Sequence, residues 1–570
     1  MNYKLGISKF NEHLIDVELN FQAEWENPIL ELPNWTPGSY KIRDYSKNII
    51  NITCDYPISK LSKHQWKITS AKNTNIVVKY QVYAFELTVR TSYLDNLYGL
   101  LTPASIFFYI SDNNNQIDNK GNQIEIDIRI QKNWKIFCTL NYTNSKYLAI
   151  NYDELIDSPI GLAHENGYEL LEYEIDKIPC EVVLIGVKGN HNIGKFKDDL
   201  IKIQKYSIEL FGELPYDRYL WALYVVGKGR GGLEHKKSNF SIINRWAFNN
   251  DEDKYNELIE LEAHEHFHAY NIKRITLDKF GPFDYSKENY TKLLWVAEGI
   301  TSHYDKVTLP RAGISDEEYY WKNVSQSYLT LLKIEGRKIK SLSEASFDAW
   351  IGLYQPHEGS HNFDISYYLK GGLVSLMLDL EIRHQTNWEN SLDTFYLELY
   401  RLYKTERFRY NDENFKQKLE EITNTNLDKF WKKYIIGVDE LDFEYYLDLI
   451  GMKIEYKFEK SPYLGLVLDS SKQNVLKVRS NSPAMKGGIY SKDKIISINQ
   501  FEMNKSTYDT IFKNLKSNDI IKIHLIRDQV LKMVEIQLED PIISKIKIIP
   551  NESSSDIVKN RRKLFLMQSK

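Results

Sequence analysis

Two histidines four residues apart, with a glutamate directly after the first, are the residues whose types and spacing point most clearly to chemistry. Residues 264–268 read His-Glu-His-Phe-His. In a helix, residues i and i+4 lie on one face, so the imidazoles of His264 and His268 can reach one cation. Glu265 then lies beside the pair, where its carboxylate can take a proton from a water molecule that attacks a carbonyl group. The pattern predicts a metal-dependent hydrolase.

A third ligand is expected 30 positions after His268 (298 minus 268), where the segment LWVAEGITSHYD carries Glu298. Two imidazoles and one carboxylate leave one position of a tetrahedral Zn²⁺ ion open for water, as in thermolysin-type sites. We therefore expect one zinc ion per chain on His264, His268 and Glu298. The alternative is that these side chains only cover helix surfaces. His266 is expected to point away from the ligands, as an ordinary surface or core histidine.

Two further segments offer groups for catalysis and substrate binding. SYYLKGG places Tyr368 at a helix start, where a phenol can stabilise the developing oxyanion. GRGGLEH follows a predicted strand, and Gly231 and Gly232 would let a substrate backbone approach closely. Glu234 could pair with a substrate ammonium group, which favours peptides with a free amino terminus. The alternative for this segment is a tight turn at a strand end with an exposed glutamate.

The elements that must position these groups follow from the patterning. Up to residue 185, short alternating runs such as IDVELNF predict a β-rich domain. Residues 190–452 have mainly helical periodicity and form the expected catalytic domain. Residues 455–545 predict a compact module of short strands, and 546–570 a C-terminal tail. The expected fold class is multidomain α+β. Long helices are expected at 256–273, 290–305 and 366–382.

Length and composition fit a multidomain globular protein. The chain has 570 residues, and one core rarely supports more than about 250 to 300. Lys and Arg total 74 against 78 for Asp and Glu, so no nucleic-acid partner is expected. The start lacks the apolar core of a signal peptide, and no run of about 18 apolar residues follows. We expect no membrane span and a cytoplasmic location. Three widely spaced cysteines predict no thiolate zinc site.

The set of motifs resembles the glycyl aminopeptidases, zinc metallopeptidases of the gluzincin group that carry a PDZ domain and are related to the aminopeptidase N group. The resemblance rests on NWTPGSYKIRDYSKNI, VYAFELTVRTSYLDNLYGLL, GGLEHKKS, HEHFHAYNIKRI, LWVAEGITSHYD and SYYLKGG, in this order. It implies a thermolysin-like catalytic domain that removes N-terminal glycine or alanine from peptides. It also implies that Glu234 lies at the amino-terminus pocket and that Tyr368 stabilises the tetrahedral intermediate. An aromatic residue would be expected where this chain has His303.

The C-terminal module resembles a PDZ domain. YLGLVL matches the carboxylate-loop pattern at Leu464, Gly465 and Leu466. Backbone amides in such a loop can hold a peptide C-terminus. The alternative is a module that packs on the catalytic domain without binding peptides.

Two other functions stay open at this point, a related zinc endopeptidase and a noncatalytic PDZ scaffold. Glu234 is the residue that separates the endopeptidase from the aminopeptidase, because it demands a free amine. The presence of Glu265 and of three ligands argues against the scaffold.

Overall fold

The computed structural model describes residues 1–111, 123–186, 192–248 and 251–567. The chain divides into two compact units. The first unit contains Met1–Thr291, Tyr304–Ser315 and Tyr396–Phe415, and the second contains Lys292–His303, Asp316–Phe395 and Lys416–Lys570. The multidomain α+β class and the β-rich N-terminal region are confirmed. The finer division into four segments stays a prediction.

The N-terminal part of the first unit is built around a seven-stranded sheet. β1 pairs in parallel with β11 and antiparallel with β2, and β2 alternates strictly between buried and partly exposed residues up to its last position. This alternation is why the sequence pattern predicted the strand. The strand order is β13 (Asn141–Thr143), β14 (Lys146–Ala149), β11 (Ile124–Ile130), β1 (Asn2–Lys9), β2 (Leu14–Gln22), β7 (Asn75–Tyr83) and β4 (Ile49–Cys54).

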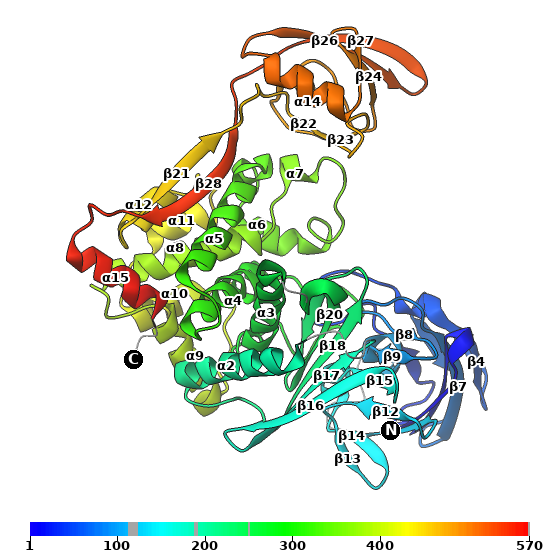
Figure 1. Cartoon of the computed structure of the whole chain (residues 1–570). Helices are drawn as coiled ribbons and strands as arrows, with labels where there is room; N and C mark the ends of the chain where they lie inside the picture. Colours follow the sequence, from blue (N-terminus) through cyan, green and yellow to red (C-terminus); the bar gives the residue numbers. More distant parts are fainter. Residues whose placement is uncertain (112–122, 187–191, 249–250, 568–570) are drawn as a thin grey trace. The chain divides into compact units, whose positions relative to one another are not determined.

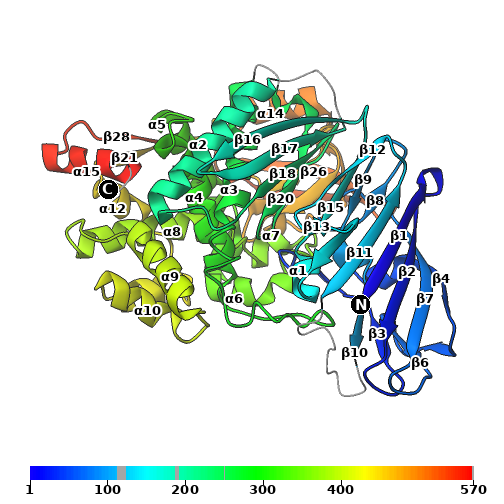
Figure 2. The same cartoon turned by 90° about the horizontal axis from the view of Figure 1, so that it is seen from below.

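A second sheet of five strands carries the glycine segment at its edge. Figure 2 labels β16, β17, β18 and β20 of this sheet. β18 is apolar and buried along almost its whole length because parallel neighbours flank it on both sides. The glycine segment is itself strand β19, antiparallel to β20, and not a turn after a strand. The order is β16 (Tyr168–Ile175), β17 (Ile178–Ile185), β18 (Tyr219–Val226), β20 (Ser238–Asn244) and β19 (Gly231–Glu234).

Helices of this unit pack beside the sheet, and their bounds correct the predicted ones. α2 (Ile193–Phe211) packs on α3 (Glu252–Phe267), which packs on β19. The predicted helix 256–273 is too long at its C-terminal end, because α3 ends at Phe267 and His268 is its C-cap residue. The chain then turns back, so that the carbonyl of Asn271 reaches the ring of His268.

The two other predicted helices are also displaced. Instead of beginning at residue 290, the second begins at Trp295 with a π-helix, η5 (Trp295–Gly299), and continues as α4 (Ile300–Arg311). The third, α8, spans Leu369–Gln385. A π-helical turn is rare and often marks a functional site, and this one contains Glu298.

In the second unit, a long two-stranded ribbon lies beside helix α5 (Figure 1). β21 (Met452–Phe458) pairs with β28 (Ile543–Pro550), and the backbone N–H of Ile548 donates to Ser325 Oγ on α5 (Glu317–Leu332) at 3.0 Å. The predicted tail 546–570 thus contains part of β28 and a further helix, α15 (Asp556–Leu566), whose Phe565 is buried.

The C-terminal module between β21 and β28 has a hydrophobic core of its own, which includes Ile495, Ile523 and Phe512. Its assignment as a PDZ domain stays a prediction. In no part of the chain that the structure describes does a helix have the length and apolar character to cross a membrane. The main elements of the module are β22 (Leu466–Leu468), β23 (Val475–Val478), β24 (Lys494–Ile498), α14 (Lys505–Asn514), β26 (Ile520–Arg527) and β27 (Val530–Gln537).

Candidate metal centre and active site

His264 and His268 present their Nε2 atoms to each other at 3.1 Å. His264 Nδ1 lies 2.9 Å from Asp305 Oδ2, and His268 Nδ1 lies 2.7 Å from the carbonyl oxygen of Asn271. A carboxylate and a carbonyl can only accept, so each Nδ1–H donates, and in neutral rings neither Nε2 carries a proton. Two such lone pairs repel unless a cation lies between them. Tetrahedral zinc with nitrogen ligands separates them by about 3.3 Å, so the pair fits this ion.

Glu298 completes a three-residue cluster with the two histidines. His264, His268 and Glu298 each offer a ligand atom, and these atoms lie within 4.8 Å of one another. Glu298 is buried and precedes Asp305 by seven residues (305 minus 298), about two turns, on one unbroken helical run through η5 and α4. One helical run therefore supplies both Glu298 and the carboxylate that holds His264.

Asp305, which the sequence analysis did not single out, is held ionised by its neighbours. Lys306 Nζ lies 3.0 Å from Asp305 Oδ1 and 3.1 Å from Glu260 Oε1. Burial raises the pKa of the Asp305 carboxyl, but Lys306 and His264 together bring it below its ordinary value. A carboxylate of this kind orients a ligating histidine and raises its basicity. Its signal in the sequence was its place two turns after Glu298.

Glu265 lies against the backbone of β19. It is 4% exposed, and a Cβ atom built on Gly232 would lie 2.1 Å from Glu265 Oε1. On Gly231, by contrast, a Cβ would meet only Arg90 Nη1, at 3.9 Å. The Gly232 carbonyl accepts a hydrogen bond from Arg90 Nη2 at 3.1 Å. The two predicted glycines therefore have different roles, and only Gly232 makes room for the carboxylate.

Glu234 is buried at the end of β19, so the alternative of an exposed turn glutamate is wrong. Ligand atoms of Glu234, Glu265 and His268 lie within 4.8 Å of one another. Lys273 Nζ lies 3.8 Å from Glu234 Oε1 and 2.8 Å from Asp157 Oδ1. Burial lowers the pKa of the Lys273 ammonium, but Asp157 and Glu234 raise it overall. Glu234 thus lies in a buried, charged environment beside the histidine helix.

The loop around Gly38 packs against the Glu234 carboxylate. Gly38 has φ +80, and a Cβ there would lie 2.8 Å from both carboxylate oxygens of Glu234. Its segment, TPGSY, belongs to the motifs of the family resemblance, but the sequence alone did not indicate that it lies at the site. Asn34, four residues earlier, fixes the loop by donating from its backbone N–H to the Tyr285 carbonyl and from its side chain to the Ser286 carbonyl, both at 2.8 Å.

Tyr368 lies at the start of α8 in the second unit. Its hydroxyl is 3.0 Å from that of Tyr354, and its ring stacks on Tyr367 with centroids 4.8 Å apart. The segments that carry Glu298 and Tyr368 are in direct backbone contact. A Cβ built on Gly299 would lie 2.7 Å from Gly371 Cα and 2.9 Å from the Tyr367 carbonyl.

The two remaining histidines of interest are both buried. His266 is a core residue, as expected. Its ring is hydrogen-bonded to the Tyr216 hydroxyl at 2.7 Å and stacks on Trp221, and burial lowers its pKa to about 3. The ring of His303 lies 6.4 Å from that of Phe565 on the C-terminal helix.

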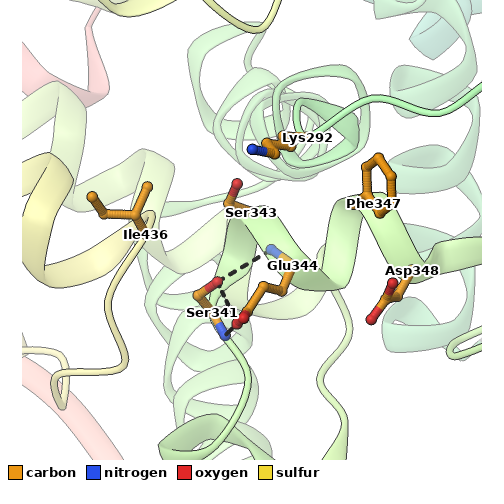
Figure 3. Close-up of a pocket in the computed structure, with 7 residues that line it drawn as sticks. All are labelled: Lys292, Ser341, Ser343, Glu344, Phe347, Asp348 and Ile436. Carbon is orange, nitrogen blue, oxygen red and sulfur yellow. Dashed lines mark hydrogen bonds between the residues drawn. The ribbon is translucent and has the colours of Figure 1, made fainter.

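Figure 3 shows a surface pocket of the second unit. It has a volume of about 300 Å³, and none of the predicted site residues lines it. Ser341 and Glu344 on its wall form a capping box at the start of α6 (Leu342–Phe347), so they stabilise the helix terminus. The lining residues are Lys292, Ser341, Ser343, Glu344, Phe347, Asp348 and Ile436.

The predicted carboxylate loop, Leu464 to Leu466, lies at the entry to β22. Gly465 has φ +88, and a Cβ there would lie 2.1 Å from Ser482 Cβ. Its carbonyl accepts a hydrogen bond from the backbone N–H of Arg479 at 3.0 Å. Only glycine fits this left-handed position.

Comparison with known proteins gives matches in both halves of the chain. Residues 2–164 match the model of the Peptidase M61 N-terminal domain, and residues 257–374 match that of the M61 glycyl aminopeptidase. A crystal structure of an aminopeptidase N family protein from Idiomarina loihiensis is 27% identical, with a TM-score of 0.91 over 99% of each chain. An M1 zinc metallopeptidase from Deinococcus radiodurans is 10% identical, with a TM-score of 0.47 over 78% of this chain and 94% of that one. No curated protein matches.

Proposed function

We propose that this metallo-aminopeptidase removes N-terminal glycine or alanine from peptides, because residues 2–164 and 257–374 match the models of the Peptidase M61 N-terminal domain and of the M61 glycyl aminopeptidase. One zinc ion per chain would be held by His264, His268 and Glu298. The observation that carries the proposal is the closeness of the buried Glu234 carboxylate to Glu265 and His268. A carboxylate there binds the ammonium group of the substrate beside the hydrolytic groups.

Each of these residues has a separate role in the proposed reaction. Bound zinc would supply Lewis-acid polarisation of the scissile carbonyl and a lowered pKa of water. Glu265 accepts the proton of the attacking water and returns it to the leaving amine. Glu234 binds the substrate ammonium, and the Tyr368 hydroxyl donates to the developing oxyanion. Gly231 and Gly232 allow the substrate backbone to approach β19.

The preference for a small N-terminal residue is supported by the crowding around Glu234. A Cβ on Gly38 would lie 2.8 Å from both carboxylate oxygens, so the Gly38 loop is packed directly against one side of Glu234. A large side chain next to the bound ammonium would meet the same loop. The thermolysin-like character of residues 190–452 is part of the proposal, and the histidine helix followed by a glutamate helix supports it.

The C-terminal module would be a PDZ domain that holds a peptide C-terminus at Leu464, Gly465 and Leu466. The positive φ of Gly465 and the strand that follows it support this assignment. The cytoplasmic location stays a prediction from the sequence.

The test compares glycyl and alanyl chromogenic amides with their N-acetylated forms. Acetylation removes the charge that Glu234 binds, so kcat/KM should fall by about a hundredfold or more. Equal cleavage of the blocked amides would assign an endopeptidase instead. Chelation should abolish hydrolysis and added zinc should restore it, with elemental analysis expected to find one zinc per chain.

A further inference from the structure

A helical turn of the second unit is hydrogen-bonded to the backbone of the C-terminal module. Asn362, on α7 (Ser360–Phe363), donates from Nδ2 to the Val478 carbonyl at 2.9 Å and accepts at Oδ1 from the backbone N–H of Ser480 at 2.8 Å. His361 Nε2 also lies 3.1 Å from the Val478 carbonyl. Asn362 is 3% exposed. A buried amide that pairs with one backbone acceptor and one backbone donor holds that segment in a single register.

The chain between Asn362 and Tyr368 has little freedom to absorb a displacement. Asp364 is bound by Lys340 at 3.3 Å, and a Cβ on Gly336 would lie 2.3 Å from the Asp364 carbonyl oxygen. Ile365 is buried as well. Close-packed segments transmit strain, so we expect a shift at Asn362 to reach Tyr368 along the chain.

Residues 478–480, to which Asn362 is hydrogen-bonded, also contact the predicted carboxylate loop. Arg479 lies between Val478 and Ser480, and its backbone N–H donates to the Gly465 carbonyl at 3.0 Å. One short segment of the module therefore contacts Gly465 on one side and Asn362 on the other.

We propose that Asn362 is a positioning residue that fixes the place of the Tyr368 hydroxyl by anchoring the chain before α8 to the C-terminal module. The inference rests on the proposed role of Tyr368 in hydrolysis. Misplacement of a catalytic group by about 1 Å can lower the rate by up to a hundredfold. We therefore expect a partial loss of kcat when the hydrogen bonds of Asn362 are removed.

The experiment measures kcat and KM for a glycyl amide in the full-length, zinc-loaded enzyme. Asn362→Ala removes both hydrogen bonds, and the isosteric Asn362→Asp keeps the acceptor but loses the donor. Both should lower kcat about tenfold with KM within about twofold, at unchanged zinc content. Asn474→Ala is the matched control and should leave kcat unchanged, because the Asn474 amide donates to Asp469 within the module, at 2.7 Å.

A double-mutant cycle with Tyr368→Phe separates positioning from general damage. When the phenol is absent, Asn362→Ala should lower kcat by less than about twofold further, because the group it positions is gone. An undiminished tenfold loss in that background, or an unchanged kcat in the single variants, would overturn the proposal. An unchanged kcat in Tyr368→Phe alone would instead refute the role of Tyr368 on which the inference rests.

Discussion

Two regions of this molecule use glycine to bring segments together, and they do so for different ends. In the first unit, Gly232 of β19 makes room for the Glu265 carboxylate of α3, which a Cβ would approach to 2.1 Å. In the second unit, Gly299 of η5 makes room for backbone, since a Cβ would lie 2.7 Å from Gly371 Cα. Gly232 leaves space for a reactive carboxylate, and Gly299 sets the distance between η5 and α8.

The difference teaches how each contact should respond to substitution. A methyl group on β19 can be accommodated only by moving a carboxylate, so the cost should appear in catalysis. A methyl group between two helices can be accommodated only by separating them, so the cost should appear in stability. The following four variants test this distinction, in order of decreasing expected effect.

The largest effect is expected for Glu265→Gln, which removes the proposed proton acceptor and keeps the shape of the side chain. We expect kcat to fall by about a thousandfold, because an amide cannot take the proton of the attacking water. Zinc content should stay at the level of the unaltered enzyme. Near-normal turnover would refute the assigned base and would leave Gly232 without a catalytic group to accommodate.

Gly232→Ala should lower kcat by about a hundredfold, because the new methyl group displaces the Glu265 carboxylate. Gly231→Ala is the matched control, since the nearest atom to its Cβ is 3.9 Å away. The control should lose much less activity than Gly232→Ala, because its methyl group leaves the Glu265 carboxylate in place. If the two neighbouring variants lost activity equally, general disturbance of β19 would explain the result.

Glu234→Gln should raise KM for free glycyl amides by about tenfold or more, because a neutral amide does not attract the ammonium group. The slow cleavage of N-acetylated amides should not change. This variant therefore tests whether the Glu234 carboxylate binds the charged amino group of the substrate. A KM unchanged for the free amides would count against the amino-terminus pocket.

Gly299→Ala should lower the free energy of unfolding by about 1 to 3 kcal/mol, the usual cost of overpacking, when measured by urea denaturation. Gly194→Ala, on α2, is the control, because its Cβ would meet only Asn192 Oδ1 at 3.7 Å. The control should be neutral or stabilising by a few tenths of a kcal/mol. Unchanged stability in Gly299→Ala would mean that the helices can separate without cost.

Much of the architecture could be predicted because its signals are local. Alternating strands such as β2 and the amphipathic helix α2 bury one face, and this leaves a period in the sequence. Helix ends were predicted less well. The end of α3 at Phe267 and the start of η5 at Trp295 depend on contacts that have no periodic signal, such as the Asn271 carbonyl on His268.

The sequence predicts ligand and base residues for the site, but it did not indicate the residues that support them. The spacing of His264, Glu265 and His268 is a property of a single helix, so the sequence carries it directly. Asp305 and Arg90 were missed. Each acts through a contact with another segment of the chain, and a carboxylate or a guanidinium taken alone has many other uses.

The sequence by itself determined the donor types, the four-residue spacing of the histidines and the presence of a carboxylate beside them, because chemistry and helical geometry are local. Only the tertiary structure decided that Glu234 is buried beside Glu265 and His268. The same holds for the finding that Gly232 and not Gly231 accommodates the base. It also holds for the hydrogen bonds between Asn362 and the C-terminal module. The physical reason is that these relations depend on how closely distant segments pack, and packing distances are set by the folded chain as a whole.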